Sequence, residues 1–166
     1  MKRVNCILHN EKYKEYCEKL NKLEKGRKYC KHGMNHFLNV ARIAYIINLE
    51  NGYGIDKEVI YAAALLHDIG RILQIEENIP HDKGSVMLSK EILIASEFSD
   101  EEIKMIQEAI GSHRKKPEDS VDESDKTRIL CRILYKADKL SRNCFKCKAI
   151  DSCNWSKKKK NIDITL

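Results

Sequence analysis

The most constraining feature of this sequence is a nearly uninterrupted apolar stretch, residues 59–66, that ends in His67 and Asp68. Asp56 precedes it as a candidate N-cap, because an aspartate side chain can accept hydrogen bonds from the first backbone amides of a helix. A helix that is apolar on every side is a buried helix. Buried charge is costly unless it has partners. The pattern therefore predicts a central helix with a polar site at its C-terminal end.

Amphipathic patterns on both sides of this stretch predict further helices, because apolar residues recur at spacings of three and four. Ser99, followed three positions later by Glu102, has the pattern of a capping box. Only two prolines and seven glycines interrupt the chain, which favours long helices. We expect helices over about 10–25, 35–49, 82–95, 99–113 and 126–144, a loop or short turn over 71–80, and a polar loop over 115–125. The predicted fold class is all-α, a bundle of five to seven helices.

The length and the N-terminal sequence bound the class of protein. A chain of 166 residues has the size of one domain. The N-terminal residues lack the apolar core of a signal peptide, and no stretch is long enough to span a membrane, so we expect a cytoplasmic protein. Seven cysteines in a reducing compartment are not expected to form a disulfide framework. No apolar stripe stands clear of the core faces to indicate an oligomeric state.

The formal net charge of +6 includes four consecutive lysines at 157–160. Such a run is most simply a solvated tail. A basic chain also attracts anionic small molecules, phosphates among them. The sequence has no aromatic-rich strand and no known recognition motif, and therefore does not favour a nucleic acid as partner.

Six polar residues occur where apolar helical faces end or point inward. Imidazole and carboxylate together suit Zn, Fe, Mn or Co, and carboxylate suits Mg or Mn. The candidate metal ligands are His36, His67, Asp68, His81, His113 and Asp138.

Three segments resemble the motifs of the HD superfamily of metal-dependent phosphohydrolases, and they occur in the family's order. They are His36 with Val40-Ala41, the stretch AAALLHDIGR at 62–71, and YKADKL at 135–140. The family usually has lysine where this chain has Arg71. The resemblance covers about 31–142, and it implies a single HD domain over 1–166 with a Cys- and Lys-rich C-terminal tail over 143–166.

The resemblance implies a divalent metal held by His36, His67, Asp68 and Asp138. In binuclear members a second ion is bound at positions matching His81 and His113, with the aspartate of the central motif as the bridge. One or two ions of Fe, Mn, Zn, Co or Mg are therefore expected. The chain is most similar to small HD hydrolases of dinucleoside polyphosphates, so the expected partner is a small phosphorylated molecule, a nucleotide. The Gly-Tyr-Pro signature of cyclic-di-GMP phosphodiesterases is absent after His113.

Catalysis at such a site needs cations opposite the charge that develops on phosphate. Asp68, Arg71 and Lys139 are the candidate catalytic residues, and Arg71 is the first candidate for contacting phosphate. Arg142 and His32 are further candidates for substrate binding. For Lys139 and Arg142 the alternative is an exposed helix face with ordinary ion pairs. For His32 the alternatives are an outer position around the metal or a surface role.

Cys144, Cys147 and Cys153 form a second candidate site in the C-terminal tail. Three nearby thiols suit a structural Zn ion or an iron–sulfur cluster, but a fourth ligand is missing locally. Cys30, Cys131 or Cys17 could supply it. A redox-reactive pair and simple packing at a helix end are the other interpretations.

Two further classes of function remain beside the phosphohydrolase. The first is a regulatory protein that binds metal or nucleotide without turnover and uses the cysteine cluster as a sensor. The second is an oxygenase, because some di-iron HD proteins oxidise their substrates. Retention of all four central ligands favours the enzyme.

Overall fold

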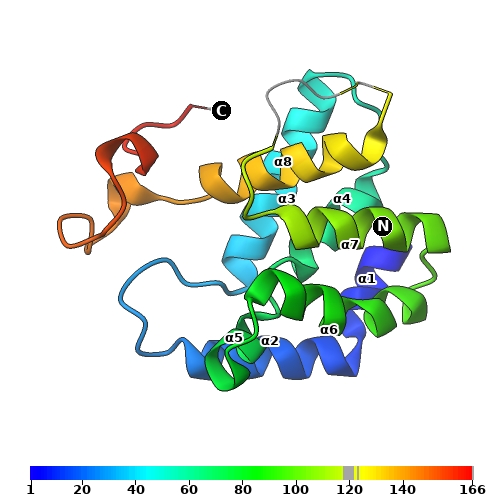
Figure 1. Ribbon diagram of the computed structural model, residues 1–166, viewed down its shortest axis with the longest axis horizontal. Helices are drawn as coiled ribbons and strands as arrows, with labels where there is room; N and C mark the ends of the chain where they lie inside the picture. Colours follow the sequence, from blue (N-terminus) through cyan, green and yellow to red (C-terminus); the bar gives the residue numbers. More distant parts are fainter. Residues whose placement is uncertain (118–121, 123, 166) are drawn as a thin grey trace.

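The computed structural model describes residues 1–117, 122 and 124–165, and all regular structure in these residues is helical (Figure 1). The α-helices are α1 (Lys2–His9), α2 (Glu11–Leu23), α3 (Met34–Glu50), α4 (Lys57–Leu66), α5 (Arg71–Glu77), α6 (His81–Ala95), α7 (Asp100–Ser112) and α8 (Lys126–Leu140), followed by two 3-10 turns, η1 (Cys144–Lys146) and η2 (Lys157–Lys159). No helix in this part of the chain is long and apolar enough to cross a membrane.

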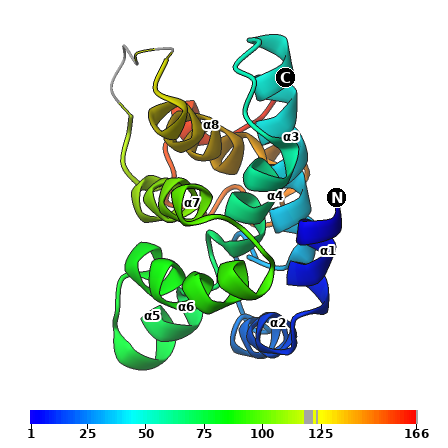
Figure 2. The same ribbon diagram turned by 90° about the vertical axis from the view of Figure 1, so that its right-hand side faces the viewer.

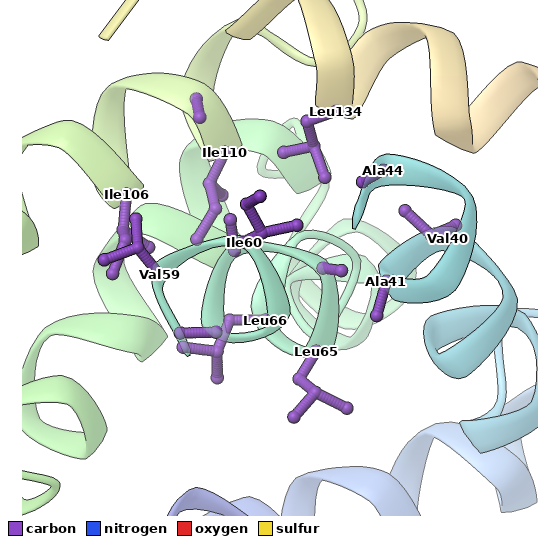
Figure 3. Packing of buried hydrophobic residues seen from close by; sticks show 14 of the residues in the cluster. Val40, Ala41, Ala44, Val59, Ile60, Leu65, Leu66, Ile106, Ile110 and Leu134 are labelled. Carbon is purple, nitrogen blue, oxygen red and sulfur yellow. The ribbon is translucent and has the colours of Figure 1, made fainter. Parts of the chain in front are cut away.

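Helix α4 is the centre of the bundle, as the apolar stretch predicts. It packs against α1, α3, α6, α7 and α8 (Figure 2). Its side chains leave the helix in different directions: Ile60 points towards α8, whereas Leu65 points away from it (Figure 3). Both side chains are fully buried. Asp56 caps the helix by accepting hydrogen bonds from its first backbone amides.

All six predicted helices are present, which confirms the all-α class. Asn10 caps α2 by accepting a hydrogen bond from the amide of Tyr13, a cap that the sequence analysis does not name. The cap predicted for α7 is confirmed in detail. Ser99 and Glu102 form the complete capping box at the start of α7. The predicted polar loop 115–125 includes positions 118–121 and 123, which lie outside the described residues.

The structure corrects the sequence analysis at two short helices. Helix α1 was not expected, and α5 replaces the loop or short turn expected over 71–80. Helices of eight and seven residues span about two turns, too short a window for apolar periodicity to reveal them. Asn78, in the left-handed conformation, ends α5, as asparagine often does at the C-terminal end of a helix.

Helix α8 ends at Leu140 rather than at Cys144, a second correction. The chain leaves the helix because other groups take its last carbonyls. The side-chain amide of Asn161 donates to the carbonyl oxygens of Lys139, Leu140 and Arg142, at 2.8 to 3.1 Å. The tail thus folds back onto the end of the helix that carries Asp138.

Helices α5 and α6 meet at two glycines. The backbone amide of Gly70 donates to Ser85 Oγ at 2.8 Å. A Cβ at Gly70 would lie 2.0 Å from the backbone nitrogen of Ser85, and a Cβ at Gly84 would lie 3.0 Å from the Gly70 carbonyl oxygen. This close approach positions the first turn of α6, where His81 lies.

Candidate metal centre and substrate cavity

The six candidate ligands lie at helix ends that converge beside α4. His36 is in the first turn of α3, His67 and Asp68 follow the last turn of α4, and His81 begins α6. His113 follows α7 and Asp138 is in the last turn of α8. Two groups have ligand atoms that all lie within 4.8 Å of one another: His36, His67, Asp68 and Asp138, and Asp68, His81 and His113. The structure therefore brings together all six residues that the sequence singles out.

Asp68 belongs to both groups, and its two carboxylate oxygens face different imidazoles. Oδ2 lies 3.2 Å from Nε2 of His67 and 3.5 Å from Nε2 of His36. Oδ1 lies 3.4 Å from Nε2 of His81 and 3.6 Å from Nε2 of His113. One buried carboxylate therefore stands between two sets of nitrogen ligands.

The two most buried imidazoles are fixed by backbone carbonyls. His67 Nδ1 lies 2.8 Å from the carbonyl oxygen of Ala64, and His113 Nδ1 lies 2.6 Å from that of Ile110. Because a carbonyl can only accept, each Nδ1 carries the proton and donates it. In the neutral form of each ring the lone pair is then on Nε2, which faces Asp68.

The other two imidazoles have the same arrangement with side-chain partners. His81 Nδ1 lies 2.8 Å from Gln74 Oε1. His36 Nδ1 lies 3.2 Å from Ser141 Oγ, whose own proton goes to a backbone carbonyl in α8. Metal-binding histidines almost always donate their second ring N–H in this way, which fixes the tautomer and the ring orientation. The donor set therefore fits divalent metal at both groups.

The electrostatics of the centre also suit a cation. Burial opposes ionisation of Asp68, but the charge of His67 and the contacts with His113 and His36 outweigh it and hold the pKa of Asp68 well below its usual range. Burial lowers the pKa of His81 to about 4 and lowers the pKa of His36 as well. Burial opposes protonation of His67, but the charges of Asp68 and Asp138 outweigh it and raise the pKa of His67. Because metal binds ionised carboxylates and neutral imidazoles, binding at His67 would release its proton.

Glu24, which the sequence analysis missed, supports one side of the centre. It is 4% exposed, and its carboxylate accepts hydrogen bonds from Arg71 Nε at 2.7 Å and His32 Nδ1 at 2.8 Å. Burial opposes its ionisation, yet these bonds lower the pKa of Glu24 to about 2. His32 Nε2 is turned towards the centre, 3.9 Å from Asp68 Oδ2. No local pattern marks Glu24, because Arg71 lies 47 positions further along the chain and His32 lies in the loop after α2.

The basic candidates all line one large cavity over the ligands, although each is partly engaged. Arg71 is paired with Glu24. Lys139 forms an ion pair with Asp138. Arg142 donates to the carbonyl of Lys139 and lies over the ring of Trp155, 4.2 Å from its centroid. All three are held in place beside the metal ligands.

The cavity, about 860 Å³ in volume, has a strongly basic wall. Its carboxylates are Asp68 and Asp138, both candidate ligands. Three aromatic side chains, Tyr29, Tyr135 and Trp155, also line it. The cations on its wall are Arg27, Arg71, Arg114, Lys136, Lys139, Arg142, Lys158 and Lys159. Part of the lysine run at 157–160 therefore faces the candidate site instead of forming only a solvated tail.

The cysteines of the tail line a separate, smaller cavity beside this one. Cys144, Cys147 and Cys153 are joined there by Cys30. The other two candidates for a fourth ligand, Cys17 on α2 and Cys131 on α8, do not line it.

Comparisons with known proteins agree with this geometry. The HD domain family matches residues 33–143, which contain helices α3 to α8 and all six candidate ligands. An uncharacterized protein of Clostridium beijerinckii is 48% identical over 164 residues, covering 99% of each chain. No solved structure matches the chain.

Proposed function

Because the chain belongs to the HD domain family, we propose that it is a metal-dependent phosphohydrolase that cleaves a phosphate ester or anhydride of a nucleotide-like substrate. The strongest support comes from Asp68. Its oxygens face two separate sets of imidazoles, and all four of these rings are locked with Nε2 towards the centre. This arrangement favours a binuclear site in which Asp68 serves both ions.

The six candidate ligands form two sets at such a site, one for each ion. His36, His67, Asp68 and Asp138 would hold one ion, and Asp68 with His81 and His113 the other. Bound divalent ions would supply a nucleophile from water of lowered pKa, about 7 in favourable sites, and positive charge opposite the phosphate oxygens.

The cavity wall supports a phosphorylated substrate. Eight cations and two carboxylates line the cavity, and both carboxylates are candidate metal ligands. The electrostatic potential of the cavity therefore favours an anion. Lys139 and Arg142 stand beside Asp138, where they can oppose charge that develops on phosphate. Tyr135 and Trp155 offer flat apolar surfaces for a nucleobase. We include the cytoplasm in this proposal, because thiols stay reduced there.

The experiment combines metal analysis with a hydrolysis panel. Wild type, reconstituted with Mn²⁺, Fe²⁺ or Zn²⁺, is offered dinucleoside polyphosphates, nucleoside monophosphates and bis(p-nitrophenyl) phosphate. Asp68→Asn should lose metal from both groups and at least about 100-fold in rate, since outer-shell changes alone cost about 10- to 100-fold. Asp100→Asn, at an exposed position in the first turn of α7, is the matched control and should retain both.

His113→Ala separates one ion from two. We expect it to lose about one equivalent of metal, because the group of His36, His67, Asp68 and Asp138 stays intact. Metal binding by wild type without turnover of any substrate in the panel would favour the regulatory alternative. Oxygen uptake by the iron-loaded protein would favour the oxygenase. Either result would contradict the hydrolase proposal.

A further inference from the structure

A second cavity, about 250 Å³ in volume, adjoins the candidate metal centre and collects four of the seven cysteines. They are Cys30, Cys144, Cys147 and Cys153. His36 and Arg142 line both cavities, so the two sites share a wall. All seven cysteines are free thiols in the structure.

The four thiols come from two segments that are distant in sequence. Cys30 lies in the loop between α2 and α3, and the other three lie in the segment that follows α8. The hydroxyl of Tyr29 donates to the carbonyl oxygen of Ser152 at 2.8 Å and ties the two segments together.

The segment after α8 has little apolar packing to hold it. Within 143–165 the structure contains only two 3-10 turns, and neither buries a residue. Phe145, Trp155, Ile162 and Ile164 are each at least 42% exposed. Small units without a core of their own usually depend on a disulfide or a structural metal. This segment nevertheless supplies Trp155, Lys158 and Lys159 to the substrate cavity.

The surroundings of the thiols match the charge of a zinc–thiolate site. Four thiolates around Zn²⁺ carry a net charge of about −2. Lys31, Arg142 and Lys160 line the same cavity and would offset it. A neutral thiol cluster needs no such cations. The tail also has local turns around its cysteines: the amide of Cys147 donates to the carbonyl of Cys144, and that of Cys153 to the carbonyl of Ile150.

We propose that Cys30, Cys144, Cys147 and Cys153 bind a structural zinc ion that fastens the tail to the loop between α2 and α3. Structural zinc is bound tetrahedrally by four protein ligands, and a C-x-x-C pair is a typical half of such a set. Of the three candidates for the fourth ligand, Cys30 alone lines the cavity.

Zinc binding would draw the two walls of the cavity together. In the part of the chain that the structure describes, no three of these four sulfurs lie within 4.8 Å of one another. Zn–S bonds are about 2.3 Å long, so coordination must bring the loop and the tail closer. The zinc would then fix Trp155, Lys158 and Lys159 in the wall of the substrate cavity without taking part in its chemistry.

The test measures zinc in the full-length chain purified under reducing conditions. In a His67→Ala/Asp68→Ala background, which removes ligands from both histidine and aspartate groups, we expect about one equivalent of zinc to remain. Adding Cys30→Ser or Cys144→Ser/Cys147→Ser should remove it, whereas adding Cys17→Ser should not. The same comparison of Cys30→Ser with Cys17→Ser in the otherwise wild-type chain should show a loss of one equivalent, which covers the case in which the double variant does not fold.

Reconstitution with Co²⁺ identifies the ligands directly. The thiolate-to-cobalt charge-transfer band should appear in wild type and Cys17→Ser, and it should weaken in Cys30→Ser. No zinc beyond the histidine and aspartate groups, or equal zinc in Cys30→Ser and Cys17→Ser, would overturn the proposal. Iron with acid-labile sulfide at these cysteines, or a Cys144–Cys147 disulfide found by mass spectrometry under reducing conditions, would overturn it as well. None of these results depends on hydrolase activity.

Discussion

Replacing Gly70 by alanine tests whether the α5–α6 contact positions the second ligand group. The new Cβ would lie 2.0 Å from the backbone nitrogen of Ser85, 2.4 Å from the carbonyl carbon of Gly84 and 2.4 Å from the carbonyl oxygen of His81. All three obstructing atoms belong to the backbone of α6, so no side-chain rotation can relieve the clash. Helix α6 must move away from α5, and His81 must move with it.

The size of the effect follows from these distances. Ordinary contacts of a Cβ begin at 3.4 Å, so the closest approach falls short by about 1.4 Å. Overpacking of a well-packed site costs about 1–3 kcal/mol. Because backbone must shift, we expect the upper end, about 3 kcal/mol of unfolding free energy. For a chain of this size that loss lowers the melting temperature by about 6–12 °C.

Thermal unfolding followed by far-ultraviolet circular dichroism measures this loss, with Gly26→Ala as the matched control. A Cβ at Gly26 meets nothing within 4 Å, so that variant should be unchanged or more stable by up to about 1 kcal/mol. Gly70→Ala should also lose metal from the group that contains His81 before the group that contains His36. Equal melting temperatures for the two alanine variants would refute the steric argument.

Three other substitutions test single interactions. Glu24→Gln should lower stability at pH 7 by up to about 3 kcal/mol, because the pKa of this buried carboxylate is lowered to about 2. Its ionised form therefore stabilises the fold fully above its ordinary pKa of 4.5, and the deficit of the variant should shrink as pH falls from there towards 2. Ser99→Ala removes half of the capping box of α7 and should cost about 1 kcal/mol in urea unfolding. Tyr13→Phe removes the hydrogen bond from its hydroxyl to the Leu65 carbonyl and should cost about 1 kcal/mol in the same assay.

Each matched control makes the same type of substitution at a position where the tested interaction is absent. Glu18→Gln and Ser156→Ala alter exposed residues, and Tyr16→Phe alters a half-buried tyrosine of the same helix as Tyr13. Each should change stability by less than about 0.5 kcal/mol. A deficit of Glu24→Gln that stays constant down to pH 3 would show that its ionised carboxylate is not the source of the stability.

The sequence could predict what depends on local pattern. The apolar residues 59–66 alone predict a buried helix. His67 and Asp68 then lie at its C-terminal end because they follow this stretch directly in the sequence. Ser99 and Glu102 predict the start of α7 for an equally local reason. The convergence of the six ligands was predicted from the family resemblance. The ligands are spread from position 36 to position 138, and no local sequence pattern shows that they lie together in the fold.

What the sequence could not predict depends on tertiary contact. Glu24 is one glutamate among many in α2 and its flanks, and only the approach of Arg71 and His32 makes it a supporting residue. Cys30 remained one of three candidates until the loop and the tail were seen to share a cavity. Helix α8 ends before its predicted end because the side-chain amide of Asn161, near the C-terminus, donates hydrogen bonds to its last two carbonyl oxygens.

The shared position of Asp68 has a consequence for the lifetime of the protein in a cell. Its ligand partners come from five helices, so the complete set exists only after these helices have docked. Metal bound at this centre would therefore stabilise the folded bundle and not the open chain, by about 2.7 kcal/mol at a free concentration 100 times the dissociation constant. That is about a 100-fold smaller open population for proteases to attack. Starvation for metal would then shorten the survival of the whole chain, and its abundance would follow the metal supply.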